Sequence, residues 1–214
     1  MPQDTATSPF NGSYTALITP FSNGNVDEAA FRKLVDFQIE NGTHGLVPVG
    51  TTGESPTLSH EEHDRVVEMC IEQAAGRVPI IAGCGSNDTN NALLHLKFAK
   101  KAGVTAGLCV APYYNKPNQD GVYRHFAWLA ERCDLPIILY NVPSRTITDI
   151  GVPVIHRLSE EFQTIVGIKD ATGNLGRVTA QRLACRPDFC QLSGNDETAL
   201  GFNAMGGKGC ISVT

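Results

Sequence analysis

The chain has 214 residues, of which 42% are hydrophobic and 18% charged, and its formal net charge is -5. This length is enough to bury a substantial core, and the composition is typical of a globular domain. The acidic balance argues against nucleic acid or an anionic membrane surface as a partner, and no apolar run approaches the length of a membrane span. The N-terminal segment resembles neither a secretory signal nor a transit peptide, which favours the cytoplasm.

Eight short apolar runs rich in β-forming residues follow one another along the chain. They cover residues 14–21, 45–50, 79–83, 107–112, 136–140, 164–168, 189–192 and 209–213. The runs are almost continuously apolar, as expected of parallel strands covered on both faces. We therefore predict a strand for each run.

Amphipathic stretches lie between most of these runs. Helices are predicted over residues 27–42, 59–76, 90–101 and 123–132. The second of these begins with Ser59 and Glu62 at capping-box spacing. Phe126 and Trp128 stand at helical spacing in the fourth, and we expect both in the core.

Repeated strand–helix units predict a parallel sheet. Eight units favour a (β/α)8 TIM barrel over residues 13–214, with residues 1–12 as a tail. An open doubly wound sheet is the alternative, but the glycine pair at 83–85 is a weak match to a dinucleotide-binding loop. The barrel is the preferred fold.

In a barrel, the chemistry lies in the loops at the C-terminal ends of the strands. These loops carry GTTGES at 50–55, PYYN at 112–115, YNVPSR at 140–145, Lys169, and GND at 194–196. Paired hydroxyls, tyrosines, an arginine and a lysine are thus predicted to meet at one rim.

Lys169 closes the apolar run 164–168 and is the candidate nucleophile. An amine held near a dry barrel interior can form a Schiff base with a carbonyl substrate, provided that its pKa falls from the usual ~10.4. The alternative is a lysine at a strand end that reaches solvent.

Three other elements of the rim suit the same chemistry. Tyr140 could carry protons, or it could simply anchor packing. Arg145 offers a fork for a carboxylate, although a surface ion pair is the commoner role. The amides and hydroxyls of Thr51 and Thr52 could hold a second carboxylate, or the segment could be a plain turn.

Other polar residues point less clearly to function. His60 and His63 lie one helical turn apart, but no third ligand is evident, so we expect no metal site. Asp170, Asp196 and Glu197 are expected to be solvated loop acids. The seven scattered cysteines are expected to be reduced and mostly buried.

Six motifs in order, from about residue 10 to the end of the chain, resemble a known family. They are GTTGES (50–55), PYYNKP (112–117), YNVPSR (140–145), GIKDATG (167–173), LSGND (192–196) and GCISVT (209–214). The chain resembles the pyruvate-dependent lyase and aldolase family that contains dihydrodipicolinate synthase and N-acetylneuraminate lyase. GTTGES together with Arg145 favours the synthase branch over the lyases of sialic acid and sugar acids.

The resemblance implies an aldolase-like lyase without metal or organic cofactor. Lys169 would condense with pyruvate, and the enamine would attack L-aspartate-4-semialdehyde to give 4-hydroxy-tetrahydrodipicolinate on the route to diaminopimelate and lysine. The roles implied for the site residues are a proton relay of Tyr140, Thr51 and Tyr114 (the last from a neighbouring subunit), pyruvate binding by Thr51 and Thr52, semialdehyde binding by Arg145, and a pocket lined by Gly194 and Ile211.

Two features depart from the family pattern. An inhibitory lysine site is implied at Ser55, His60, His63, Asn87 and Tyr113, but Asn91 replaces the usual acid, so we expect weak or absent inhibition. The chain stops after the eighth strand, so we expect the eighth helix and C-terminal helical region to be missing. The family's homotetramer, a dimer of dimers, is expected only where that region is present. A sugar-acid aldolase and a truncated, non-catalytic barrel are the alternatives.

Overall fold

The computed structural model describes residues 10–213, and within them eight parallel strands form a barrel. The strands are β1 Gly12–Ala16, β4 Gly45–Val47, β5 Ile81–Gly83, β6 Ala106–Val110, β7 Ile137–Asn141, β8 Ile165–Asp170, β9 Cys190–Ser193 and β10 Gly209–Ser212. Their order in the sheet is β4-β1-β10-β9-β8-β7-β6-β5. A parallel bridge between Leu46 and Ile80 joins the two ends of this order and closes the ring.

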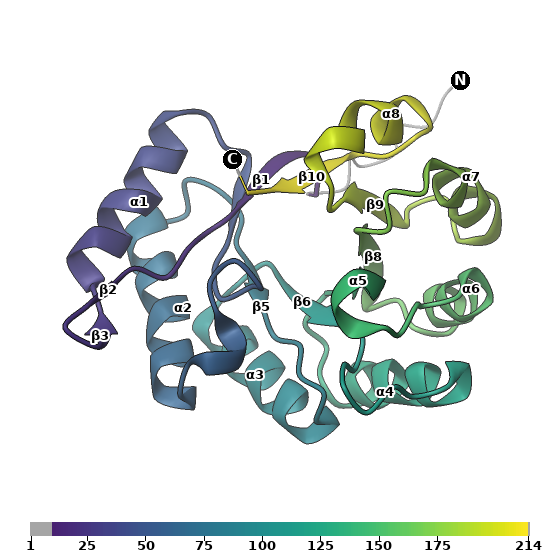
Figure 1. The fold of residues 1–214 in the computed structure, drawn as a ribbon, viewed down its shortest axis with the longest axis horizontal. Helices are drawn as coiled ribbons and strands as arrows, with labels where there is room; N and C mark the ends of the chain where they lie inside the picture. The colour runs from purple at the N-terminus through teal and green to yellow at the C-terminus, as the bar shows by residue number, and fades with distance from the viewer. Residues whose placement is uncertain (1–9, 214) are drawn as a thin grey trace.

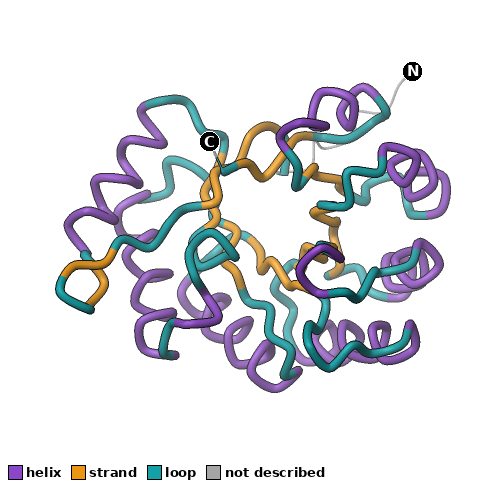
Figure 2. Tube along the Cα trace, viewed as in Figure 1, coloured by secondary structure: helices purple, strands orange, loops and turns teal. Residues whose placement is uncertain are grey.

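Helices surround the strands on the outside, as Figure 1 and Figure 2 show. They are α1 Glu28–Glu40, α2 His60–Ala74, α3 Thr89–Ala102, α4 Gln119–Arg132, α6 Val152–Glu161, α7 Leu175–Ala184 and α8 Ala199–Ala204, whereas the short α5 Pro143–Thr146 lies inside this layer, near the strands (Figure 1). Two 3-10 turns, Ser55–Thr57 and Asp196–Thr198, and a small hairpin of β2 Phe21–Ser22 and β3 Asn25–Val26 complete the described elements. The strand–helix alternation confirms the (β/α)8 barrel predicted from the sequence.

Local sequence explains where two of the helices begin. The Asp27 side chain accepts a hydrogen bond from the Ala30 amide at the start of α1. At the start of α2, the Ser59 side chain accepts from the Glu62 amide while the Glu62 carboxylate accepts from the Ser59 amide. The predicted capping box is therefore confirmed, and both helix starts satisfy amides that the helix itself leaves unpaired.

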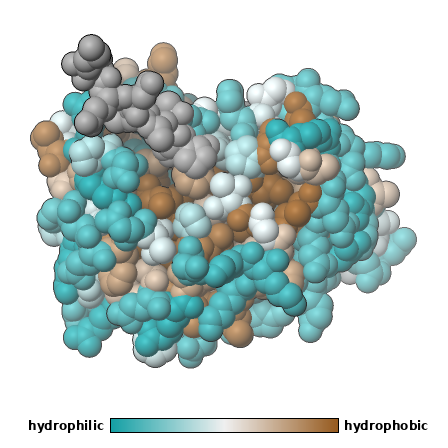
Figure 3. All heavy atoms as spheres, turned by 180° about the vertical axis from the view of Figure 1, so that it is seen from behind, coloured by the Kyte–Doolittle hydropathy of each residue, from teal (hydrophilic) through white to brown (hydrophobic). Residues whose placement is uncertain are grey.

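Alternation along the strands divides the core into two layers. In β7, Ile138 and Tyr140 belong to a cluster that fills the barrel interior, whereas Ile137 and Leu139 pack with helical residues such as Phe126. This division follows from the period of two in a strand, since successive side chains point to opposite faces. Seen from the opposite side of the molecule, hydrophobic residues gather towards the middle of the face (Figure 3).

The structure corrects several predicted boundaries and one predicted core residue. The first apolar run ends as a strand at Ala16, and Phe21 belongs to the exposed β2–β3 hairpin. Trp128 is 42% exposed, because it lies about 200° around α4 from the buried Phe126, and the Arg132 guanidinium lies over its ring at 3.3 Å. The sequence of α4 does not show which of its aromatic residues faces the core and which faces outward.

Three further expectations concern the N-terminal tail, the state of the cysteines and the presence of a membrane span. Phe10 is buried and Gly12 begins β1, whereas residues 1–9 of the predicted tail, and Thr214, lie outside the described residues. All seven cysteines are free, and only Cys210 is more than slightly accessible, as predicted. Within the described part of the chain, no helix combines the length and the apolar character needed to cross a membrane.

Candidate active site

Lys169 stands inside β8, one residue before the strand ends, and not just beyond it as predicted. Its neighbour Ile168 packs in the outer layer, so alternation directs Lys169 into the barrel. The side chain is 7% exposed, and its Nζ lies 4.5 Å from the centre of the Tyr140 ring, directly across from it in the paired strand β7. The amine is therefore shielded and adjacent to the phenol of Tyr140.

Burial lowers the pKa of Lys169 to about 8, while the charges of Asp196 and Cys210 act in the opposite direction. At that value ~10% of the amine is uncharged at pH 7, against ~0.03% for an ordinary lysine. The shift corresponds to about 3 kcal/mol, which the fold supplies by holding the amine away from water. Only the uncharged amine has the lone pair with which a nucleophile attacks, so the lowered pKa increases the reactive fraction of Lys169.

Gly194 lets the backbone pass close to this lysine. A Cβ built there would lie 3.0 Å from Cε of Lys169 and 2.6 Å from Cβ of Ala171, which is too close for a real side chain. The Gly194 amide donates to the carbonyl of Asp170 at 2.8 Å, which fixes the approach. Ile211 of β10 is fully buried in the interior cluster, so both residues form part of the wall around the barrel interior.

Tyr140 links the lysine to the loop after β4. Burial raises the pKa of its phenol, and a side-chain hydrogen bond with Thr51 and the charge of Arg145 both act to lower it. The net effect keeps the phenol protonated at neutral pH, so that it can pass a proton on through the Thr51 hydroxyl. Three of the predicted site residues thus interact in one place.

The loop after β4 is folded tightly around two glycines. The Gly53 amide donates to the Gly50 carbonyl at 3.1 Å, and the Thr19 hydroxyl donates to the Gly53 carbonyl at 2.7 Å. The turn leaves Thr51 exposed and Thr52 half-buried. A loop fixed in this way can present hydroxyls and amides to an anion.

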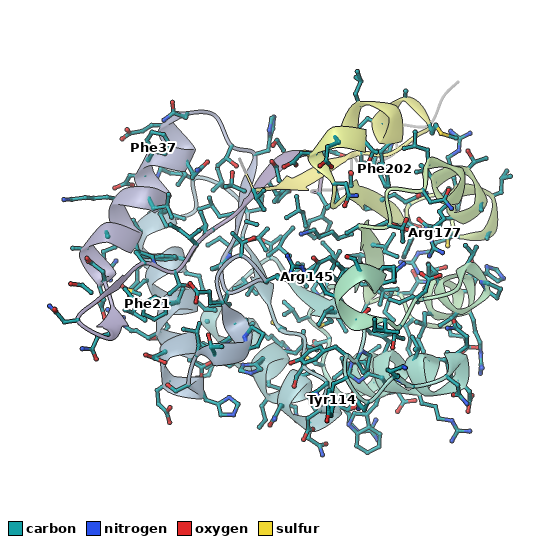
Figure 4. All side chains as sticks on the ribbon, viewed as in Figure 1. Phe21, Phe37, Tyr114, Arg145, Arg177 and Phe202 are labelled. Atoms are coloured by element: carbon teal, nitrogen blue, oxygen red, sulfur yellow. The ribbon has the colours of Figure 1, made fainter. Side chains whose placement is uncertain are left out.

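A cavity of about 430 Å³ opens beside these residues. Its lining comprises Val49, Gly50, Thr51, Ser55, Pro56, Leu58, His60, His63, Gly83, Gly85, Ser86, Asn91, His95, Leu108, Val110, Tyr113, Tyr140, Val142, Arg145 and Thr146. Arg145 lies over the centre of the ring of strands in Figure 4. Lys169 does not line this cavity itself but is in contact with Tyr140, which does.

Tyr114 and Asn87 lie apart both from this cavity and from the residues around Lys169. Tyr114 is 90% exposed with a positive φ of 68°, and it lies at the edge of the molecule in Figure 4. Asn87 does not line the cavity, and its carbonyl accepts a hydrogen bond from Asn115 at 3.1 Å. Within this chain, the structure does not bring Tyr114 together with Tyr140 and Thr51.

The prediction that Asp170 is a solvated loop acid is wrong. It is the last residue of β8 and 3% exposed, and its carboxylate accepts from Arg177 Nε at 3.1 Å and from Gln181 Nε2 at 2.7 Å. Its other oxygen accepts from the amide and the hydroxyl of Thr172 at 3.0 and 2.6 Å. Both donors on α7 become available only when that helix packs behind the strand, whereas Asp196 and Glu197 are exposed as predicted.

This carboxylate belongs to a network behind the site. Arg177 Nη1 also donates to Asp149 Oδ2 at 3.1 Å, and Asn141 Nδ2 donates to Asp149 Oδ1 at 2.7 Å. Asn141 is the last residue of β7 and pairs with Asp170, directly next to the pairing of Tyr140 with Lys169. Sequence reasoning missed this network, although two polar residues ending adjacent apolar strands were a usable signal.

Imidazoles from two helices gather at the other end of the cavity. The ring of His95 on α3 lies 3.9 Å from that of His63 and 5.1 Å from that of His60, both on α2. Donor atoms of His63, Asp64 and His95 all lie within 4.8 Å of one another. The sequence showed only His60 and His63, because the contact with His95 depends on the packing of α3 against α2.

Burial sets the charge of these imidazoles. Burial, with a smaller contribution from the charges of His63 and His60, lowers the pKa of His95 to about 4, while the charge of Asp64 acts in the opposite direction. Burial also lowers the pKa of His63, against a hydrogen bond with the Gly83 carbonyl. Both rings are therefore neutral at pH 7.

Comparisons with known proteins identify the family of this chain. The profile of the dihydrodipicolinate synthetase family matches residues 9–214. A 4-hydroxy-tetrahydrodipicolinate synthase of Novosphingobium aromaticivorans is 62% identical over 206 residues, covering 96% of this chain and 70% of the relative, and that of Erythrobacter litoralis is 63% identical with the same coverage.

Solved structures show the same fold. The dihydrodipicolinate synthase of Aquifex aeolicus has a TM-score of 0.94 at 46% identity, and a chloride-inhibited dihydrodipicolinate synthase of Acinetobacter baumannii, solved with pyruvate, has a TM-score of 0.92 at 48% identity. Each of these matches covers 95% of this chain and 70% of the other. Because the family profile matches nearly the whole of this chain and the two relatives are more than 60% identical to it, the chain belongs to the dihydrodipicolinate synthetase family.

Proposed function

We propose that Lys169 is the nucleophile with which this chain condenses pyruvate and L-aspartate-4-semialdehyde, the reaction of a lyase in lysine and diaminopimelate biosynthesis. The observation that carries the proposal is the buried amine of Lys169, with its pKa lowered to about 8, against the ring of Tyr140. The product is 4-hydroxy-tetrahydrodipicolinate.

The neutral amine attacks the ketone carbon of pyruvate and forms a carbinolamine. Loss of water gives a protonated Schiff base, and loss of a proton from the pyruvate methyl group gives an enamine. The enamine carbon then bonds to the aldehyde carbon of the semialdehyde, whose oxygen takes up a proton. The semialdehyde amine displaces Lys169 as the ring closes, which returns the free enzyme. These steps need proton transfer and a shielded amine, and the residues of this site offer both.

Tyr140 and Thr51 move the protons in this scheme. The phenol of Tyr140 lies beside the amine, and its hydrogen bond with Thr51 leads towards the cavity. We assign the outer end of the relay to Tyr114 of a neighbouring subunit, which fits its exposure of 90% at the edge of this chain.

The remaining rim residues bind the two carboxylates. The amides of Thr51 and Thr52 hold the carboxylate of pyruvate, and the guanidinium of Arg145 binds that of the semialdehyde, at about 1.5–3 kcal/mol for each charged hydrogen bond. Gly194 and Ile211 line the pocket around the Schiff base. The position of Arg145 on the cavity wall, beside Tyr140, supports its assignment to the carboxylate of the semialdehyde.

Trapping of the Schiff base tests the proposal directly. Borohydride added in the presence of pyruvate should fix one pyruvate-derived group on Lys169, and mass spectrometry of a digest locates it. Lys169→Arg should abolish the adduct, whereas Lys101→Arg, an exposed change on α3, should preserve it. Failure to label wild-type Lys169 would overturn the mechanism, and a preference for sugar aldehydes over the semialdehyde would favour the alternative aldolase.

Feedback by lysine belongs to the same cavity. Ser55, His60, His63 and Tyr113 line it, but Asn91 offers no charge to an ammonium group. We therefore expect weak or absent inhibition of turnover by L-lysine. Asn91→Glu should strengthen inhibition, and potent inhibition of the unchanged chain would contradict this reasoning.

We further propose that residues 13–214 act as one barrel domain of a cytoplasmic enzyme. Assembly as a dimer of dimers is expected where the C-terminal region of the family is present. Sedimentation of the chain with and without that region measures the oligomeric state. If the chain formed a tetramer equally well with and without that region, assembly would not depend on the C-terminal region.

A further inference from the structure

A cluster of nitrogen and oxygen donors lies on the cavity wall formed by α2 and α3. It consists of His63 and Asp64 on α2 and His95 on α3, with His60 beside them. One donor atom from each of the first three lies within 4.8 Å of the other two. None of the steps assigned to Lys169 uses this cluster, although its three histidines line the same cavity.

The hydrogen bond of His63 defines which of its nitrogens is free. Nε2 lies 2.8 Å from the Gly83 carbonyl oxygen, and because a carbonyl only accepts, Nε2 must carry the hydrogen. Nδ1 of the neutral ring then carries a lone pair, and it lies 3.3 Å from Oδ1 of Asp64. Two acceptors at this separation repel each other unless a proton or a metal cation lies between them.

His95 distinguishes between those two possibilities. A shared proton would need only His63 and Asp64, yet a ring nitrogen of His95, a third potential metal ligand, lies close to both. Among the described residues, His95 has no hydrogen-bond partner, and its ring lies 3.9 Å from that of His63 on the open side of the cluster. A ligating imidazole usually has its other nitrogen held by an outer-shell partner, as the Gly83 carbonyl holds His63, and His95 brings a second imidazole next to it.

We propose that His63 Nδ1, a carboxylate oxygen of Asp64 and a ring nitrogen of His95 bind a divalent transition metal of the Zn²⁺ type. The two imidazoles select against Mg²⁺ and Ca²⁺, which prefer oxygen ligands. Three protein ligands leave a fourth position that faces the cavity, where His60 or a ligand from solution completes the coordination. The metal bridges α2 and α3.

The spacing of the donors suits this ion. Tetrahedral coordination with bonds of ~2.0–2.1 Å places neighbouring ligand atoms ~3.4 Å apart. His63 Nδ1 and Asp64 Oδ1 already stand at 3.3 Å. The Asp64 and His95 side chains are only half-buried, so rotation of either side chain can bring the third donor in without moving a helix. The Gly83 carbonyl meanwhile holds the His63 ring in place, as an outer-shell partner does.

Zinc binding to the chelator-treated protein tests the proposal. Calorimetry with Zn²⁺ alone should give about one ion per chain, and Co²⁺ should give the intense visible absorption of a tetrahedral site with nitrogen ligands. Saturating Zn²⁺, at ~100 times its dissociation constant, should raise Tm by about 5–10 °C. Mg²⁺ should produce neither effect. These readouts do not depend on turnover, so they stand or fall separately from the chemistry of Lys169.

Two half-buried ligands provide variants that should still fold. His95→Asn and Asp64→Asn should each weaken Zn²⁺ binding at least tenfold and abolish the rise in Tm, in keeping with ~10–100-fold losses seen even for outer-shell changes. His156→Asn, an exposed change on α6, is the matched control and should bind as the wild type does. Unchanged zinc affinity in both test variants would place the ion on other groups and overturn the proposal. Absence of zinc binding by the wild type would do the same.

Discussion

The pH dependence of adduct formation at Lys169 follows from the burial of its amine. With a pKa of about 8, the uncharged fraction is ~10% at pH 7, ~50% at pH 8 and ~90% at pH 9. An amine with the ordinary pKa of 10.5 would instead go from ~0.03% to ~3% over the same range. The rate of Schiff-base formation should therefore rise about tenfold from pH 7 to pH 9 and then level off, rather than rising about 100-fold.

The assay is a timed quench with borohydride at saturating pyruvate, in which the mass of the chain reports the labelled fraction. The same measurement on Nα-acetyl-lysine, divided by the uncharged fraction of its own amine at each pH, corrects for the pH dependence of carbinolamine dehydration, which is independent of the protein. Lys169→Arg establishes the background, and Lys101→Arg shows that other amines do not contribute. A corrected rate that still climbs tenfold per pH unit up to pH 9 would mean that the amine is solvated, and the catalytic interpretation of Lys169 would fail.

Three substitutions test other parts of the site. Tyr140→Phe removes the hydroxyl that is hydrogen-bonded with Thr51 but keeps the ring beside the amine, so kcat should fall ~10²–10⁴-fold with little change in either KM. Arg145→Ala should lower kcat/KM for the semialdehyde by ~10–150-fold for each charged hydrogen bond lost, with KM for pyruvate unchanged. Asp170→Ala leaves Arg177 without a buried partner and should lower the free energy of unfolding by about 3 kcal/mol, measured by urea denaturation.

Each substitution has a matched control on the surface. Tyr123→Phe and Arg124→Ala, both on α4, should leave the kinetic constants unchanged. Asp188→Ala removes an exposed partner of Arg186 and should change stability by less than ~1 kcal/mol. If Tyr140→Phe kept its turnover, if Arg145→Ala affected pyruvate instead of the semialdehyde, or if Asp170→Ala were as mild as its control, the corresponding assignment would be wrong.

The overall fold could be predicted because local patterns carry it. Near-continuous apolar runs indicate parallel strands that are covered on both faces, and the runs around Ile138 and Ile168 are strands as predicted. The capping box of Ser59 and Glu62 also depends on neighbours three residues apart, so the sequence alone fixed where α2 starts. Four helices were not predicted. The helices α5 and α8 span only 4 and 6 residues and carry little periodicity, and α6 and α7, at 10 residues each, were missed as well.

The candidate site could likewise be predicted only in part from the sequence. Its residue types and their place at strand ends were readable from the sequence, and so was the resemblance to a family. The lowered pKa of Lys169 was not, because it depends on desolvation by strands that meet only when the barrel closes. The burial of Asp170 and the approach of His95 to His63 likewise arise from contacts between separate elements. Periodicity and capping act over a few neighbouring residues, whereas electrostatics depends on distance in space, which only the folded chain defines.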